Sequence, residues 1–187
     1  MSKVYLKIPT LEELKFRQEW MKNPKTMEYN AGLNVNIKGY NYNDGTISWS
    51  DADFTDWYNR WIGKEPNKYF AYIYEIENDN IPVGEIYFYY DDESKLYNMG
   101  IVISYQNRGK GYSEEALLEL EKIAFETYKI TELSDMIAEN RIGAIKSFKK
   151  AGFVETDLVK EEFVFDEKIK VKQLLLTREL YLINKLK

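Results

Sequence analysis

The chain has 187 residues, of which 44% are hydrophobic and 16% aromatic. This is enough apolar surface for one domain with a sizeable core, and it argues against disorder. The formal net charge of −5 argues against a nucleic-acid partner, because phosphate backbones attract basic surfaces. The chain has no cysteine and no histidine, which excludes disulfides, cysteine nucleophiles and histidine-based triads. Carboxylates are then the remaining metal ligands, and we expect no metal site.

No segment of the sequence predicts an association with a membrane. Residues 1–7 lack the apolar core of a signal peptide, and no apolar run approaches the length of about 18 residues that a membrane span requires. We therefore expect a single domain over residues 1–187, located in the cytoplasm.

The first third of the chain predicts a strand and two helices separated by a long loop. An alternating segment over residues 4–8 predicts the strand. A capping box over residues 10–13 predicts a helix that ends near Lys22. Residues 23–49 are rich in Asn, Gly and Tyr and predict an irregular loop, and long loops are often functional. A second helix is expected over residues 50–62, where aromatic side chains recur at helical spacing, either as core or with one or two rings facing a substrate.

The rest of the chain predicts a mixed sheet. Three strands that form antiparallel hairpins are followed by two helices alternating with a strand, and then by a last hairpin; these elements cover residues 69–76, 81–90, 96–104, 113–128, 133–138, 141–151, 153–160 and 171–179. The fourth and fifth strands flank one helix, so we expect them to be parallel neighbours. The fold class is α/β in the broad sense, an α+β domain with a mixed sheet.

A glycine loop, Arg108-Gly-Lys-Gly-Tyr-Ser113, joins an apolar strand to the start of a helix. Crowded backbone N–H groups and the positive end of the helix dipole make such a junction suitable for a phosphorylated ligand. The loop lacks the P-loop pattern, and it fails the dinucleotide pattern because Glu114 stands where the third glycine belongs. It does match R/Q-x-x-G-x-G/A, with Ser113 at the last small position.

The segment Asn140–Phe153 ends in Lys-Ala-Gly-Phe and lies about thirty residues after the glycine loop. Together the two motifs resemble the GNAT superfamily of acyl-CoA-dependent N-acetyltransferases, most clearly over residues 81–154. The resemblance implies a central, mostly antiparallel sheet of about six or seven strands, with the fourth and fifth parallel and splayed, flanked by about four helices. It also implies acetyl-CoA as co-substrate and allows a homodimer.

The resemblance assigns the cofactor site to three segments of this chain. The pyrophosphate would lie on the loop, the pantetheine arm would meet the main chain of the fourth strand, and further contacts would come from the segment Asn140–Phe153, where Asn140 could cap the helix. The implied cofactor-binding residues are Ile101, Val102, Ile103, Arg108, Gly109, Lys110, Gly111, Tyr112, Ser113, Glu114, Asn140, Ser147 and Phe148.

Two features depart from the family pattern. One extra residue separates Asn140 from Ala144, and Phe148 stands where many members have the tyrosine that protonates the departing thiolate. Phenylalanine cannot donate a proton, so water, Tyr112 or Tyr105 could take that role, or the thiolate could leave unprotonated. A thiol with a pKa near about 8.5 makes that tolerable.

Acetyl transfer requires a neutral amine, so a carboxylate base would help. Asp135 on the fifth strand and Glu85 on the third are the two catalytic candidates, and Asn98 cannot serve because an amide is no base. Either carboxylate could also be simply structural.

By resemblance, the acceptor pocket forms from residues 23–62 and the last hairpin. Tyr29, Asn30 and Trp57 are the candidate substrate-binding residues, and the acidic segment Glu161–Glu167 could attract a cation or simply be solvated. We expect an enzyme that transfers acetyl from acetyl-CoA to a primary amine of a small molecule or peptide in a ternary complex. The alternative is a non-catalytic acyl-CoA-binding or sensing module on the same fold.

Overall fold

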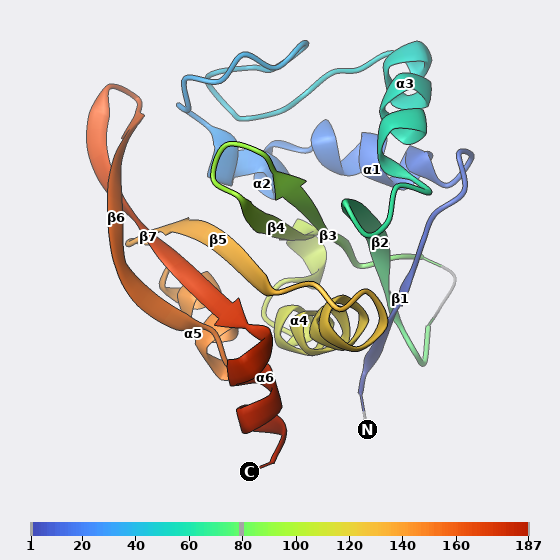
Figure 1. Ribbon diagram of the computed structural model, residues 1–187. Coiled ribbons are helices and arrows are strands. Elements are labelled where there is room, and N and C mark those ends of the chain that lie inside the picture. Colours follow the sequence, from blue (N-terminus) through green and yellow to red (C-terminus); the bar gives the residue numbers. More distant parts are fainter. Residues whose placement is uncertain (1, 79–80, 187) are drawn as a thin grey trace.

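A computed structural model describes residues 2–78 and 81–186 and shows one seven-stranded sheet with helices on both faces (Figure 1). The elements, in chain order, are β1 (Val4–Lys7), α1 (Leu14–Met21), α2 (Pro24–Met27), a 3-10 turn (Glu28–Asn30), α3 (Asp51–Trp61), β2 (Lys68–Glu75), β3 (Gly84–Asp91), β4 (Leu96–Ile103), a 3-10 turn (Tyr105–Asn107), α4 (Tyr112–Glu121) continued by a π-helical turn (Lys122–Thr127), β5 (Glu132–Ala138), α5 (Ile142–Lys150), β6 (Val154–Val164), β7 (Glu167–Thr177) and α6 (Arg178–Lys185).

The strand order is β1-β2-β3-β4-β5-β7-β6, and every neighbouring pair is antiparallel except β4 and β5. This confirms the expected mixed sheet and its parallel central pair. Because α4 carries the chain from the end of β4 back to the start of β5, the two strands must run in the same direction.

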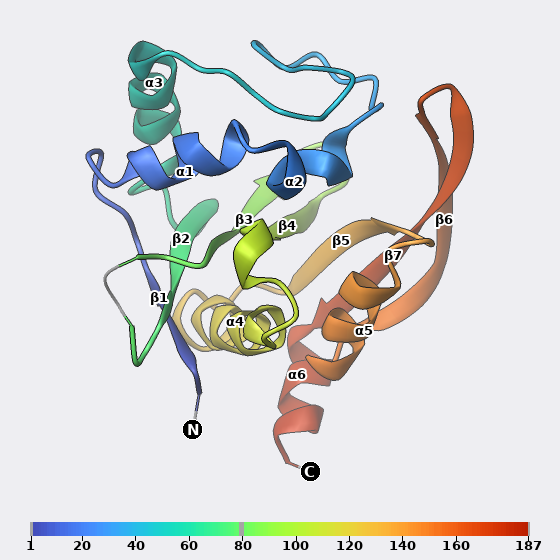
Figure 2. The same cartoon turned by 180° about the vertical axis from the view of Figure 1, so that it is seen from behind.

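Successive side chains of β2 point to opposite faces of the sheet, and both faces are buried there. One set of β2 side chains, with Phe70 and Tyr72 among them, packs against α1 and α3. The alternate set, with Ala71 and Ile73 among them, packs in the cluster that contains the apolar face of α4. Figures 1 and 2 show α1, α2 and α3 on one side of the strands and α4 on the other.

The structure adds two helices to the four that the sequence predicted. The short α2 lies in the segment expected to be loop, where the Asn23 side chain accepts the N–H of Thr26. The C-terminal α6 replaces the end of the expected strand over residues 171–179, because the Thr177 side chain caps a new helix through the N–H of Leu180. No helix in the described ranges has the length and apolar character needed to cross a membrane.

The long loop after α2 is attached to the tip of the β6–β7 hairpin. The N–H of Phe165 donates to the carbonyl of Gly32 at 2.9 Å, and Leu33 bridges to Val164. The Phe165 ring packs edge-on against Tyr42, with 5.5 Å between ring centres. The hairpin therefore extends along the side of the sheet to the level of the loop (Figure 1). Two segments that are far apart in sequence thus contact each other.

Candidate active site

The parallel strands β4 and β5 separate after a single bridging pair, Asn98–Ser134. Beyond that pair β4 continues to Ile103, and among the described residues it pairs there with β3 alone. Among the described residues, Ile101, Val102 and Ile103 therefore have no sheet pairing on the β5 side. This leaves main-chain groups in the opening between the strands, where a ligand could hydrogen-bond to them.

The glycine loop at the end of β4 presents unpaired backbone N–H groups. Gly109 and Gly111 have φ values of +79° and +87°, in the left-handed region that other residues enter only with strain. Gly111 is the N-cap of α4. Within the described ranges the N–H groups of residues 109–114 have no hydrogen-bond acceptor. Since the start of a helix also carries partial positive charge, the loop is suited to an anion such as a pyrophosphate.

The two basic side chains of the loop are already engaged with the protein. The Arg108 guanidinium donates to a Glu28 carboxylate oxygen at 2.5 Å and to the carbonyl of Thr26 at 2.7 Å. The Lys110 ammonium donates to the Asn107 side chain at 2.9 Å. Arg108 therefore ties the loop to α2 rather than pointing freely at a ligand. The sequence could not show this, because Glu28 lies far away along the chain.

Helix α5 packs beside the start of α4 and adds side chains there. The hydroxyls of Ser113 and Ser147 lie 3.1 Å apart, and the Lys150 ammonium donates to Glu114 at 2.8 Å. The structure thus brings the predicted Ser147 to the loop. Asn140 does not cap α5: the N-cap is Arg141, and no side chain forms a capping bond there. The extra residue before Ala144 moves Asn140 into the preceding turn, where it is exposed.

Phe148 lies in the core and is 1% exposed, with its ring edge-on to Phe153 and the two centres 4.9 Å apart. A contact between this position and a cofactor would therefore involve its main chain. Of the two tyrosines considered as proton donors, Tyr112 donates to Glu75 on β2 at 2.5 Å, and this bond helps raise its pKa to about 12. Tyr105 is 46% exposed at the end of β4.

A cavity of about 250 Å³ lies between α1, α3 and the face of β2 and β3 that they cover. Its walls are one arginine and five aromatic rings, namely Arg17, Trp57, Trp61, Phe70, Tyr87 and Tyr89. Trp57 was predicted as a substrate residue and does line this cavity. The other lining residues were not predicted from the sequence, although side chains two positions apart on a strand, such as Tyr87 and Tyr89, share one face.

Glu85 lies on that same face of β3 and forms a buried ion pair with Arg17, with 2.5 Å between Oε1 and Nη1. Their side chains are only 8% and 14% exposed, respectively. Burial raises the pKa of Glu85, and the Arg17 charge opposes that rise. Glu85 is therefore committed to a partner, which makes it the weaker of the two candidate bases.

Asp135 on β5 has the properties of a base that works near neutrality. Burial raises its pKa to about 7, while a hydrogen bond from the N–H of Met136 and the charge of Arg141 oppose the rise. Burial raises the pKa values of Tyr87 and Tyr89 in the cavity wall, and the charge of Asp135 adds to the rise. Asp135 directly follows Ser134, the β5 residue that pairs with Asn98 of β4, so it lies where the two strands begin to separate.

Tyr87 forms the wall between that cavity and β4. A Cβ atom on Gly100 would lie 2.4 Å from the Tyr87 hydroxyl oxygen, so the glycine is what allows the ring to cross β4. The ring thus reaches the strand whose far end opens onto the glycine loop. Burial raises the pKa of Tyr87, so its hydroxyl keeps its proton at neutral pH.

The predicted substrate residues Tyr29 and Asn30 follow α2. The Arg141 guanidinium donates to the carbonyl of Tyr29 and lies over its ring, 4.9 Å from the centre. Tyr29 packs against the cluster that contains Trp57 and Phe70, and burial with the Glu85 charge raises its pKa to about 12. The carbonyl of Asn30 accepts from the Tyr40 hydroxyl within the loop. The acidic segment Glu161–Glu167 is at the hairpin tip and largely exposed.

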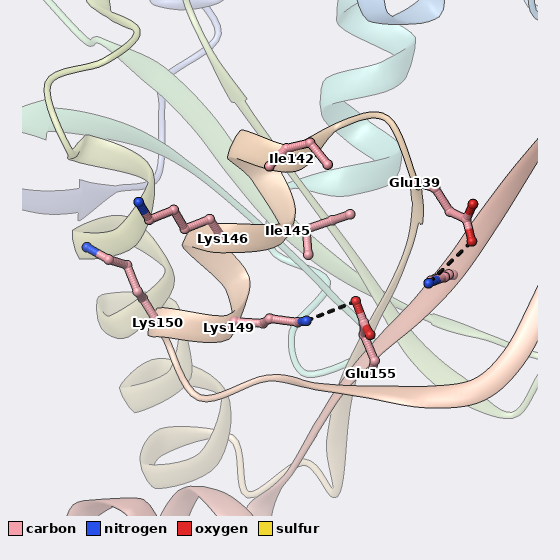
Figure 3. Close-up of a pocket in the computed structure, with 8 residues that line it drawn as sticks. Glu139, Ile142, Ile145, Lys146, Lys149, Lys150 and Glu155 are labelled. Atoms are coloured by element: carbon pink, nitrogen blue, oxygen red, sulfur yellow. Dashed lines mark ion pairs between the residues drawn. The ribbon is translucent and has the colours of Figure 1, made fainter.

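A larger cavity, of about 600 Å³, lies on the outer side of α5 against β6 and β7 (Figure 3). Two ion pairs cross it, Lys149–Glu155 at 3.0 Å and Lys172–Glu139 at 3.3 Å. Lys146 and Lys150 also line the cavity, and in Figure 3 their ammonium groups lie toward α4. The cavity therefore lies behind the α5 face that meets the glycine loop. No cluster of three potential metal ligands occurs in the parts of the chain that the structure describes.

The model of the acetyltransferase (GNAT) domain family matches residues 4–154, and no curated protein matches the chain. Among solved structures, the chain is similar to a spermidine N-acetyltransferase from Vibrio cholerae in complex with CoA and spermine, at 16% identity over 96% of this chain and 98% of that one, with a TM-score of 0.75. An acetyltransferase of the GNAT family from Bacillus anthracis matches at 16% identity over 96% and 98% of the two chains, with a TM-score of 0.71.

The structural matches establish the fold, and the family model covers most of the chain. The chain therefore belongs to the GNAT acetyltransferase family and is an N-acetyltransferase.

Proposed function

We propose that this protein transfers an acetyl group from acetyl-CoA to the primary amine of a small molecule or peptide, with both substrates bound at once. The observation that carries the proposal is the opening between β4 and β5. β4 leads to the unpaired N–H groups of the glycine loop, Asp135 follows the β5 residue that pairs with β4, and Tyr87 of the aromatic cavity pairs with Gly100 of β4. The spermidine N-acetyltransferases of similar fold make small amines the first acceptors to test.

The residues around the opening fit acetyl-CoA. The pyrophosphate would be held by the backbone N–H groups of residues 109–114, and the pantetheine amides by the main chain of residues 101–103. Main-chain N–H groups of β4 would also stabilise the negative charge that develops on the carbonyl oxygen as the amine attacks. We infer no metal in this chemistry, since a thioester is already activated toward amines.

Asp135 is the proposed base for the acceptor. An alkyl ammonium with a pKa near 10.4 must lose a proton before it can attack, which costs about 4–5 kcal/mol at pH 7. With its own pKa raised to about 7, Asp135 is partly ionised at neutral pH and can accept that proton directly or through a water. The amine then attacks the thioester carbonyl, the carbon–sulfur bond breaks and CoA leaves as a thiolate or, once protonated, as a thiol.

The test is a panel of primary amines with acetyl-CoA, read as free thiol released. The readout is clean because the chain has no cysteine. We expect thiol release that depends on the amine, and a loss of about 10²-fold in kcat/KM for Asp135→Asn. Glu132→Gln is the matched control, because it removes a carboxylate from the same strand. Glu132 is the first residue of β5, and its carboxylate accepts the N–H of Tyr97. An acetylated enzyme trapped with acetyl-CoA alone would contradict direct attack in a ternary complex.

A further inference from the structure

Five rings form a continuous aromatic box around the cavity between α3 and β3: Trp57, Trp61, Phe70, Tyr87 and Tyr89. Trp57 is stacked on Trp61 with 5.7 Å between centres and meets Phe70 edge-on at 4.8 Å. Trp61 meets Tyr87 edge-on at 5.5 Å. Such a box normally attracts a cation, because the faces of aromatic rings are electron-rich.

In this chain the cation is already supplied by the protein. The Arg17 guanidinium lies 4.4 Å from the centre of the Trp57 ring and 5.1 Å from that of Phe70. Its pairing with Glu85 at 2.5 Å fixes it there. The Arg17 side chain of α1 thus occupies the place that the ammonium group of a ligand could otherwise take in the box.

The ion pair is enclosed as well as formed. Arg17 Nε and Glu85 Oε2 are both shielded from solvent, and neither has a hydrogen-bond partner among the described residues. A ligand ammonium in the box would face the guanidinium at short range and would have to separate the pair to reach Glu85. A flat or apolar group can occupy the same space and leave the pair intact.

We propose that Arg17 is a specificity-determining residue of the acceptor site: it makes the aromatic box accept the uncharged body of a monoamine and reject the second charge of a diamine or polyamine. This rests on the proposed function, because it requires that the body of the acceptor occupies the box while its amine is acetylated. It gives this chain an acceptor class different from the spermidine named for its structural neighbours.

The experiment compares two acceptors that differ only in a second ammonium, hexylamine and 1,6-diaminohexane, with phenethylamine as an aromatic monoamine. We expect the wild type to show kcat/KM at least 10-fold higher for hexylamine than for the diamine, and to accept phenethylamine. A wild type that favours the diamine overturns the proposal.

Two substitutions test the role of Arg17 directly. Arg17→Met removes the guanidinium that an ammonium in the box would face, so the ratio should shift at least 10-fold toward the diamine. Lys15→Met removes the same charge from an exposed position of α1 and should leave the ratio unchanged. If Arg17→Met does not fold, Glu85→Gln carries the test: it keeps the guanidinium and should move the ratio no closer to the diamine. An unchanged ratio in folded Arg17→Met, or a shift toward the diamine in Glu85→Gln, refutes the proposal.

Binding separates this inference from the proposed function. Trp57 and Trp61 line the box, so an amine that enters it should change tryptophan fluorescence whether or not it is acetylated. If no amine releases thiol but hexylamine alters the fluorescence at concentrations where the diamine does not, the proposed function fails and the box selectivity stands. If neither amine alters it, or only the diamine does, the selectivity is refuted.

Discussion

Glu121, at the end of α4, provides a test of the core electrostatics that does not depend on any substrate. Glu121 is only 3% exposed, and its Oε1 atom has no hydrogen-bond partner among the described residues. Burial raises its pKa to about 8, against a small opposing effect of the Lys122 charge. In the unfolded chain the same carboxyl has a pKa near about 4.3.

The sign follows from linkage. The folded-state pKa is raised, so the stability that this group contributes is fully present below the unfolded pKa and is lost as pH rises through the folded value. Between pH 6 and pH 8 the unfolded chain has already released the proton while the folded chain still holds most of it. The wild type should therefore lose about 2 kcal/mol over this window from Glu121 alone.

Glu121→Gln removes the titration and keeps the shape. Urea unfolding followed by tryptophan fluorescence at pH 6, 7 and 8 gives the free energy of unfolding of both proteins. Their difference should change by about 2 kcal/mol in favour of Gln as pH rises, because contributions from other groups, Asp135 included, cancel. Glu119→Gln, which breaks a surface pair with Lys122, should change stability by less than about 1 kcal/mol. A wild-type-minus-Gln difference that stays constant within about 0.5 kcal/mol would falsify the reasoning.

Three further predictions concern the proposed site. With a pKa of about 7, the ionised fraction of Asp135 rises from about one tenth at pH 6 to about nine tenths at pH 8. The ratio of the wild-type kcat/KM to that of Asp135→Asn should therefore rise about 10-fold over that range. A ratio that does not change with pH would exclude Asp135 as the base. Gly111→Ala should cost about 1–2 kcal/mol of strain and weaken acetyl-CoA binding measured by calorimetry. Gly63 also has a positive φ and open space around it, so Gly63→Ala should cost the same stability and leave the affinity for acetyl-CoA intact. Equal affinities of the two variants for acetyl-CoA would show that the loop is not part of the site. Acetyl-CoA at about 100 times its Kd should raise the Tm by about 5–10 °C, and an unchanged Tm would contradict the cofactor site.

Local patterns in the sequence determined most of the fold. The nearly continuous apolar runs of β2 and β3 indicate strands buried on both faces, and the order of strands and helices requires β4 and β5 to be parallel. The capping box at Ser50 and Asp53 forms as a local pattern dictates. The expected bonds between Thr10 and Glu13 also form, although α1 begins only at Leu14. These features depend on residues close together in the chain, so spacing alone carries them.

The glycine loop could likewise be recognised from the sequence, because its proposed function depends on backbone N–H groups and on φ values that favour glycine. What its side chains do could not. Arg108 is bound to Glu28, and Tyr112 to Glu75, partners that only the folded sheet brings within reach.

The proposed acceptor site depends on the tertiary structure. The aromatic box draws its rings from α3, β2 and β3, and the pairing of Arg17 with Glu85 joins α1 to β3 across a face of the sheet. The raised pKa of Asp135 arises from burial between elements that are distant in sequence. Ion pairing and desolvation depend on distances in space, and the sequence specifies those only through the complete fold. The acetyl donor could therefore be inferred from local spacing, while the chemistry that selects the acceptor emerged only from the assembled sheet and helices.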